Sequence, residues 1–548
     1  MNSFDSLSLT LAEASRLRSM GKPELERDHL LAAWKEGLKS PDVLYQVAES
    51  FFMDHEYENT LKFITLACKY NSESPLYSYL LGMTFLKLKK PNEAVKAFLS
   101  ISDEQRLFQA DIELANMFKG SLKDNFGLSY LELVFRKSST LDSLTKLIIQ
   151  QIKVLHKLAE VPDGFLNSIQ ENLKLWQRES GDISEVYKWF GLFYQRVGLY
   201  EQSQEAYLRY LESNPDDQTV AHNLYQNFLS LGHYDKCFDS PIKRDQQQKA
   251  IGSNRDVMLA RGIREISYSD LSRLVGKKVI LSPEQGMGDQ IWSLSFISVF
   301  QNEFGCDFEI WCAPKLADVL KGFLINRCLV KSFDQVLPQD GIDAYGFISM
   351  PDVMFLLHRW GLNLEPSKAF MSCSQVLENI IVRTLNSSDV PSIRSNLNRR
   401  VGLSWKSQGS SRGDTKNLSL SFLQRFREIN NTEFICCQYG DVRDDLAHLK
   451  EHGLDVFQDE TLNLYDSLVD SYRTIADCDK IITSSNVTAH IAGSLGVKTL
   501  LIVNTPTIWY WSNSSKSSWY QSVKVIRKRL EDPWDVLWPE VCNFLSTS

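Results

Sequence analysis

The sequence has few cysteines that could form a motif. Its 548 residues contain ten cysteines, which are scattered apart from the adjacent pair Cys436 and Cys437, and no C-x-x-C occurs. This pattern excludes the common zinc signatures, and in a chain of this size it is typical of reduced thiols. We therefore expect no bound metal and a cytoplasmic location.

The sequence also lacks long apolar runs and an excess of basic residues. No segment approaches the length of a membrane span, and residues 1–11 have neither the basic region nor the apolar core of a signal peptide. Lys and Arg number 60 against 68 Asp and Glu, a formal net charge of −8. This balance argues against a dedicated nucleic-acid binder. With 43% apolar residues, the chain has ordinary globular composition and enough length for three or four domains.

The N-terminal half carries a repeat of 34 residues. Pro41 and Pro75 are separated by this period, and so are Gly198 and Gly232. Repeats of this length with small and large apolar residues at fixed positions predict TPR-like helix pairs that stack on their neighbours. We expect four to six such pairs within residues 1–240.

The small and aromatic residues of these repeats are expected to pack between helices rather than to touch a ligand. A solenoid of helix pairs exposes an extended concave surface that typically binds other proteins. The array is therefore predicted to dock a protein, either an acceptor substrate or a second copy of this chain.

A βαβ unit is predicted near the C-terminus. A short apolar strand at 480–483 is followed by Ser485 and Asn486, both good N-cap residues, then by a helical run over 487–495. The unpaired N–H groups and positive dipole end of such a helix suit a phosphate group. Taken alone, the segment is more simply read as an ordinary βα turn without a ligand.

A second βα turn is predicted after the strand at 277–282. It contains Gly286, Gly288 and Asp289, and an amphipathic run follows over 291–300. The two glycines allow the backbone to approach a ligand closely, and Asp289 would lie at the rim of the same crevice. The alternative is that Asp289 is only an N-cap or first-turn acid.

A third turn follows the predicted strand at 400–405. Its polar loop holds Lys406, Arg412 and Lys416, and a helix is expected from about Ser421. Cations at the carboxyl end of a strand suit an anionic ligand such as a nucleotide diphosphate. A solvated basic loop is the simpler reading of any one of these lysines.

Three motifs together resemble a known family. The G-M-G-D-Q-I-W turn, the V-G-L-S-W-K strand and the S-S-N-V-T-A-H-I-A-G-S-L-G-V block occur in the same order as in TPR-fused bacterial glycosyltransferases. These enzymes are similar to ADP-heptose:lipopolysaccharide heptosyltransferases and, more distantly, to O-linked N-acetylglucosamine transferases. The resemblance covers about residues 275–535. It implies a GT-B fold, in which two Rossmann-like α/β halves face each other across a cleft.

The resemblance also implies a division of the chain. The donor nucleotide sugar would be held mainly by the C-terminal half and the acceptor by the N-terminal half. The expected parts are a TPR-like region at 1–240, a linker at 241–275, an N-terminal half at 276–390, a C-terminal half at 391–530 and a terminal helix at 531–548.

Roles for single residues follow from the same resemblance. Asp289 would be the catalytic base that takes the proton of an acceptor hydroxyl, and Lys416 would neutralise the leaving diphosphate without a metal or a cofactor. His490 would either touch phosphate or tie its helix to a neighbouring loop. Further donor contacts are expected from Gly286, Gly288, Lys406, Arg412, Ser485, Asn486, Val487, Thr488 and His490.

Two departures from the family pattern bear on this reading. Many relatives carry an aspartate at or beside Ser485 and Asn486, and a Trp-Arg-Trp where this chain has Trp-Tyr-Trp at 509–511. The sequence predicts a transferase of sugar from a nucleotide-diphosphate donor to a protein hydroxyl. The alternatives are a transferase that builds a glycan, and a non-catalytic scaffold with a degenerate transferase domain. A homo-oligomer is compatible with each.

Overall fold

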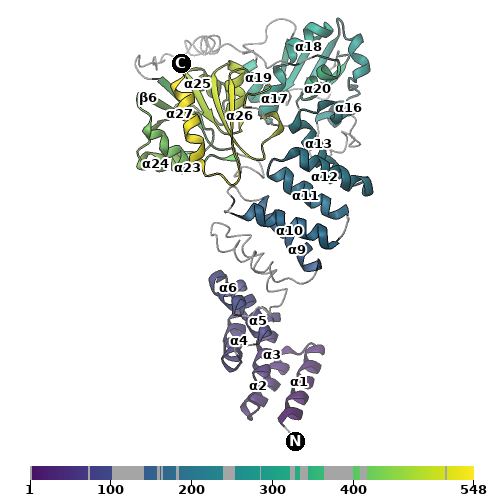
Figure 1. Cartoon of the computed structure of the whole chain (residues 1–548), viewed down its shortest axis with the longest axis vertical. Helices are drawn as coiled ribbons and strands as arrows, with labels where there is room; N and C mark the ends of the chain where they lie inside the picture. Colours follow the sequence, from purple (N-terminus) through teal and green to yellow (C-terminus); the bar gives the residue numbers. More distant parts are fainter. Residues whose placement is uncertain are drawn as a thin grey trace. The chain divides into compact units, whose positions relative to one another are not determined.

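Two compact units make up the chain. The computed structural model describes residues 3–71, 74–100, 141–156, 161, 164–180, 184–238, 254–283, 286–320, 328–333, 343–362, 364, 399–407, 416–511 and 515–547. The first unit comprises residues 1–154 and 162–180, and the second comprises 155–161 and 181–548. Figure 1 labels the elements of both.

The first unit is built from antiparallel helix pairs, as the repeat predicts. Several helices begin with proline, whose fixed φ suits the first turn. Gly82 packs against Phe98 of the next helix so closely that no side chain fits there, which explains why this repeat position takes a small residue. The helices are α1 (Ser3–Ser19), α2 (Pro23–Lys35), α3 (Pro41–Met53), α4 (Tyr57–Tyr70), α5 (Pro75–Lys87), α6 (Pro91–Leu99), α9 (Leu141–Leu155) and α10 (Phe165–Ser180).

The second unit begins with more helices of the same kind. Gly191 packs against Tyr207 in the way that Gly82 packs against Phe98, so the same pairing of a small residue with an aromatic ring recurs. The helices are α11 (Ser184–Arg196), α12 (Tyr200–Ser213), α13 (Gln218–Leu231) and α14 (Tyr234–Phe238).

A four-stranded parallel sheet follows in the second unit. Its strand order is β3-β2-β1-β4, with Ile280 of β1 opposite Glu309 of β2 and Phe347 of β4. The strands are β1 (Lys278–Ser282), β2 (Asp307–Cys312), β3 (Cys328–Ser332) and β4 (Gly346–Ser349), and the helices around them are α16 (Asn254–Ala260), η1 (Tyr268–Arg273), α17 (Met287–Leu294), α18 (Ile297–Phe304), α19 (Pro314–Leu320) and α20 (Asp352–Arg359).

A six-stranded parallel sheet forms the rest of the second unit. Its order is β10-β9-β8-β5-β6-β7. Counted along the chain from β5, this is the doubly wound order, and the direction of winding reverses between β5 and β8. The strands are β5 (Arg399–Ser404), β6 (Thr432–Cys436), β7 (Val456–Phe457), β8 (Lys480–Thr483), β9 (Lys498–Asn504) and β10 (Val523–Lys528).

Helices cover both faces of this second sheet. The terminal helix α27 packs on it through Trp538 and Phe544, in one core with Phe422 and Phe426. The other elements are α23 (Leu420–Gln424), η3 (Arg425–Glu428), α24 (Arg443–Glu451), α25 (Leu468–Ala476), α26 (Val487–Leu495), η4 (Trp509–Trp511), η5 (Trp534–Leu537) and α27 (Trp538–Ser546).

The predicted fold class, helical repeats followed by parallel α/β sheets, is confirmed. One helix differs from the prediction. The sequence indicated a single run over 291–300, whereas the structure has two helices, α17 from Met287 and α18 from Ile297. Residues 241–253 of the expected linker lie outside the described residues, whereas Ile266 donates a backbone hydrogen bond to Phe347 at the first sheet. The domain limits remain predictions.

Candidate functional site

The glycine-bearing turn after β1 and the serine-bearing turn after β8 are distant in sequence, but they lie side by side in the structure. Helix α17 starts after β1, α26 starts after β8, and the two helices are in contact. At their contact Gly288 lies against the imidazole of His490, where a Cβ on Gly288 would be 2.8 Å from Cδ2 of the ring. The turn that holds Gly286 and Gly288 and the turn that holds Ser485 and Asn486 therefore lie next to each other.

The two carboxylate oxygens of Asp289 differ in their hydrogen bonding. Its Oδ2 accepts a hydrogen bond from the Gly286 N–H at 2.9 Å, which caps α17. Its Oδ1 is buried and has no hydrogen-bond partner among the described residues. Burial raises the pKa of Asp289 to about 6, although the Gly286 N–H and the charge of Lys416 oppose the rise. Asp289 is thus a first-turn acid that also keeps a proton-accepting oxygen near neutral pH.

His490 is packed as a neutral ring. Its side chain is buried, its Nδ1 lies 3.2 Å from the Tyr520 hydroxyl, and its ring centroid lies 4.8 Å from that of Trp511. Burial lowers the pKa of His490 to about 3, so the imidazole carries no charge at neutral pH. The ring contacts Tyr520 and Trp511 in the segment after β9, and its role toward a phosphate stays a prediction.

Asn486 and Thr488 connect α26 to the strand on the other side of the reversal point. The Asn486 Oδ1 accepts from the Thr488 N–H at 2.9 Å, and its Nδ2 donates to the Ser404 Oγ at 2.8 Å and the Lys406 carbonyl at 3.1 Å. The Thr488 hydroxyl lies 3.2 Å from the same Ser404 Oγ. These side chains hold the carboxyl ends of β5 and β8 together, and the neighbouring Val487 is half-buried.

The charge of Lys406 is paired with a carboxylate of the domain that holds the six-stranded sheet. Its Nζ forms an ion pair with Asp445 at 2.5 Å, and the same carboxylate accepts from the Trp405 Nε1 at 2.8 Å. Lys406 does not line the cavity described below. Arg412, from the same predicted loop, lies outside the described residues.

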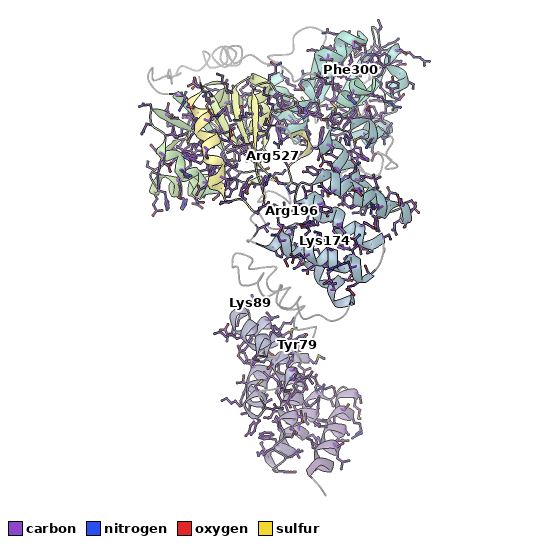
Figure 2. All side chains as sticks on the ribbon, viewed as in Figure 1. Tyr79, Lys89, Lys174, Arg196, Phe300 and Arg527 are labelled. Atoms are coloured by element: carbon purple, nitrogen blue, oxygen red, sulfur yellow. The ribbon has the colours of Figure 1, made fainter. Side chains whose placement is uncertain are left out.

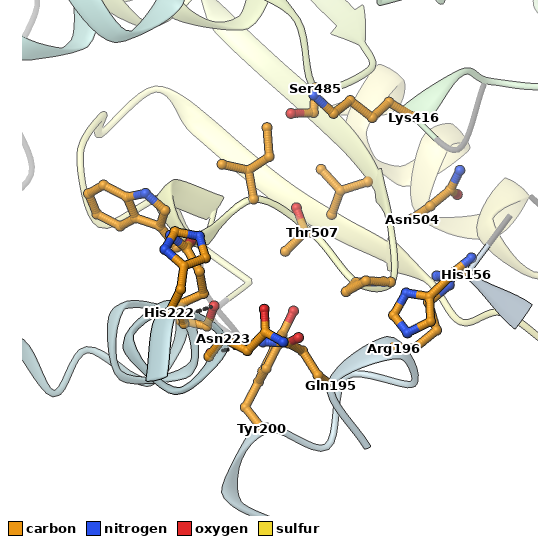
Figure 3. Close-up of a pocket in the computed structure, with 16 residues that line it drawn as sticks. His156, Gln195, Arg196, Tyr200, His222, Asn223, Lys416, Ser485, Asn504 and Thr507 are labelled. Atoms are coloured by element: carbon orange, nitrogen blue, oxygen red, sulfur yellow. Dashed lines mark hydrogen bonds between the residues drawn. The ribbon is translucent and has the colours of Figure 1, made fainter. Parts of the chain in front are cut away.

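A cavity of about 240 Å³ lies beside the carboxyl ends of β8 and β9. Lys416 and Ser485 lie together at one end of it, with the Lys416 side chain pointing toward Ser485 (Figure 3). The Ser485 Oγ accepts from the Trp511 Nε1 at 3.0 Å. The lining residues are His156, Gln195, Arg196, Tyr200, His222, Asn223, Gln226, Ser230, Lys416, Ser485, Val503, Asn504, Pro506, Thr507, Ile508 and Trp509.

Half of this cavity is formed by the helical repeats, which the sequence did not predict. Arg196 at the end of α11 is buried and donates to the Thr505 carbonyl at 2.9 Å and to the Leu155 carbonyl at 2.9 Å. Gly198, whose φ is +81°, lies so close to the Thr505 Cγ2 that no side chain fits between them. The loop after β9 is thereby fixed to the repeats.

A second attachment is aromatic. Tyr234 of α14 contacts Trp509 and Trp519, with ring centroids 6.5 and 6.2 Å apart. Arg527 donates to the Trp511 carbonyl, and burial lowers its pKa. Figure 2 marks Arg527 and Arg196 in neighbouring parts of the second unit, and both charges act on the buried hydroxyl of Tyr200. These contacts hold the last repeats to the second sheet.

One side-chain group has the composition of a metal site. His448, Glu451 and His452 on α24 each offer a ligand atom, and these atoms lie within 4.8 Å of one another. Glu451 and His452 are exposed, and the His448 Nε2 lies 2.9 Å from the Gln424 Nε2. None of the three lines the cavity.

Among the described helices, none is both long and apolar enough to cross a membrane.

Comparisons with known proteins give distant similarities. No protein-family model matches the chain. The chain is 23% identical over 289 residues to Protein FlbA of Caulobacter vibrioides, a match that covers 48% of this chain and 45% of FlbA, so it spans less than half of that relative.

Similar solved structures fall into two groups. A family 9 glycosyl transferase from Veillonella parvula is 10% identical, with a TM-score of 0.33, over 49% of this chain and 90% of that one. The C-terminal part of a TPR repeat-containing protein from Cytophaga hutchinsonii is 10% identical, with a TM-score of 0.32, over 43% and 96%. A tetratricopeptide repeat protein from Parabacteroides merdae is 8% identical, with a TM-score of 0.23, over 44% and 78%.

Proposed function

We propose that this protein is a glycosyltransferase of the GT-B type that moves a sugar from a nucleotide-diphosphate donor to an acceptor hydroxyl. The observation that carries the proposal is the position of Lys416 and Ser485 together in one cavity at the carboxyl edge of the second sheet. Open α/β sheets bind ligands outside the carboxyl ends of their strands, where the winding reverses. Here that place lies between β5 and β8, next to Ser485.

The chain supplies groups for each end of the reaction. Asp289 takes the proton of the acceptor hydroxyl through its unpaired Oδ1, while the hydroxyl oxygen forms a bond to the anomeric carbon. The bond from that carbon to the phosphate oxygen breaks, and the diphosphate leaves with the bonding electrons. Lys416 and the N-terminus of α26 offset its charge. The charge of Lys416 already acts on Asp289, which supports a shared site.

The acceptor in this proposal is a protein docked by the helical repeats, in the cytoplasm. The support is that helical repeats of the second unit line the cavity, so a protein held by these repeats would lie beside the reacting groups. A glycan acceptor is the second candidate. A non-catalytic scaffold is the third. The unpaired oxygen of Asp289 speaks against it, because a buried acceptor without a partner costs stability and a scaffold has no use that would offset this cost.

The test is release of nucleoside diphosphate from a panel of UDP-, GDP-, ADP- and dTDP-linked sugars, with and without a lysate of acceptor proteins. We expect release with one donor class in the wild type and none in Asp289→Asn. Equal background release in both proteins for every donor would leave the scaffold as the better account.

A further inference from the structure

We propose that the cavity receives the sugar ring of the donor, and that helix α13 of the repeat region recognises its hydroxyl groups. The inference rests on the proposed function, since it takes the diphosphate to lie at Lys416 and Ser485. It goes further by assigning sugar recognition to the helical repeats rather than to the sheet domains alone.

The first support is the pattern of side chains on α13. His222, Asn223 and Gln226 line the cavity, and their spacing places them on one face of the helix. His222 is exposed, whereas Asn223 and Gln226 are half-buried. Imidazole and amide groups both donate and accept hydrogen bonds, as is required to bind sugar hydroxyls.

This face of α13 is held rigidly. The Gln195 Nε2 donates to the Asn223 carbonyl at 3.0 Å and to the Asn227 Oδ1 at 2.7 Å. The Asn227 Nδ2 donates in turn to the Ser203 Oγ at 2.8 Å. Because α11, α12 and α13 are bonded to one another in this way, the polar groups are positioned before a ligand arrives, which reduces the entropy lost on binding.

The second support lies on the opposite wall. The Thr507 Oγ1 is buried and has no hydrogen-bond partner among the described residues, and Figure 3 shows the side chain within the cavity. A buried hydroxyl without a partner is costly, and a sugar hydroxyl would satisfy it. Trp509 also lines the cavity, and an indole offers an apolar surface of the kind that packs against the CH groups of a sugar ring.

The size of the cavity selects the part of the donor that fits. Its volume of about 240 Å³ is below the roughly 300–1,000 Å³ of sites that enclose a whole drug-sized ligand. It holds one sugar ring rather than a complete nucleotide sugar. With the diphosphate at the Lys416 end, the ring lies between α13 and Thr507.

The experiment compares free nucleotides with nucleotide sugars by isothermal titration calorimetry on the full chain. The probes are UDP, GDP, ADP and dTDP, each beside UDP-N-acetylglucosamine, GDP-mannose, ADP-glucose or dTDP-glucose. The variants are Thr507→Val and Gln226→Leu, which remove polar groups at nearly constant volume. Thr219→Val is the matched control, because Thr219 is exposed at the start of the same helix.

We expect each variant to weaken binding of the nucleotide sugar about tenfold, the size of one lost hydrogen bond, and to leave binding of the free diphosphate unchanged. Parallel weakening of both ligands, or no change in either, would overturn the assignment to the sugar. If no probe binds the wild type, the proposed function fails and this inference fails with it. Circular dichroism melting of each variant separates these outcomes from misfolding.

Discussion

Gly288 and His490 form a contact between helix α17, which follows the first strand of the four-stranded sheet, and helix α26 of the six-stranded sheet. A Cβ atom at Gly288 would lie 2.8 Å from the His490 Cδ2, and the ring has little freedom to move, because it is buried between Trp511 and the Tyr520 hydroxyl. The approach of α17 to α26 therefore depends on the absence of a side chain at Gly288.

Gly288→Ala should lower the free energy of unfolding by about 1–3 kcal/mol, the usual cost of overpacking a buried contact. His490→Ala removes the ring that the new methyl group would meet. In urea unfolding, the double variant should therefore lose less stability than the sum of the two single variants. Strictly additive losses would contradict the contact.

Asp289→Asn should abolish sugar transfer and leave the affinity for nucleoside diphosphate nearly unchanged. The amide keeps an oxygen that accepts from Gly286, so the cap of α17 survives, but it cannot take a proton. Turnover and calorimetric binding measured on the same preparation check the two statements. Turnover within a few-fold of wild type would remove Asp289 as the base.

The pH dependence of turnover should reflect the raised pKa of Asp289. A base works in its deprotonated form, so the rate should fall as the pH is lowered through about 6. Because the charge of Lys416 lowers this pKa, the midpoint should move upward in Lys416→Ala. A midpoint that stays in place would show that the two groups are not coupled.

The same pKa has a consequence for folding. Folding raises the pKa of Asp289 from 3.8 to about 6. The native state therefore binds more protons than the unfolded state between about pH 4 and 6. Above about pH 6 the buried, ionised carboxylate of Asp289 lowers the free energy of unfolding. This loss is relieved as the pH falls and the carboxylate is protonated. Asp289→Asn should be more stable than wild type in thermal melts at pH 7.5, with the difference shrinking toward pH 4.

Gly198→Ala should separate the two reasons for glycine at this repeat position. Gly198 and Gly232 both have positive φ, +81° and +72°, but only Gly198 has a neighbour in the way, the Thr505 Cγ2. Gly232→Ala should cost about 1 kcal/mol for backbone strain, and Gly198→Ala about 1–3 kcal/mol more. Adding Thr505→Ser, which removes that methyl group, should return the cost to the Gly232 value. Equal costs for the two single variants would contradict the attachment of the repeats to this loop.

Local patterns predicted the fold and the position of the turns well. Asn486 was expected as an N-cap and accepts from Thr488 as such, since capping depends on residues next to each other in sequence. The pairing of Lys406 with Asp445 was not foreseen, because it joins the loop after β5 to helix α24, two segments far apart in sequence that only the sheet brings together. The contribution of the helical repeats to the cavity was missed for the same reason. The 34-residue period already accounted for Gly198, and nothing in the neighbouring sequence indicates its contact with Thr505.

The measurement that tests the central claim most directly is a thermal-shift comparison of the wild type and Lys416→Ala with UDP, GDP, ADP, CMP and dTDP and their sugar conjugates. A ligand that binds the native state raises the melting temperature by mass action. We predict a shift with one nucleotide class in the wild type, weakened in the variant by about 1–3 kcal/mol of binding free energy, the size of a lost charge-assisted hydrogen bond. Lys450→Ala, an exposed lysine of α24, is the control and should behave as wild type. No shift with any nucleotide, or equal shifts in wild type and Lys416→Ala, would contradict a donor site at Lys416.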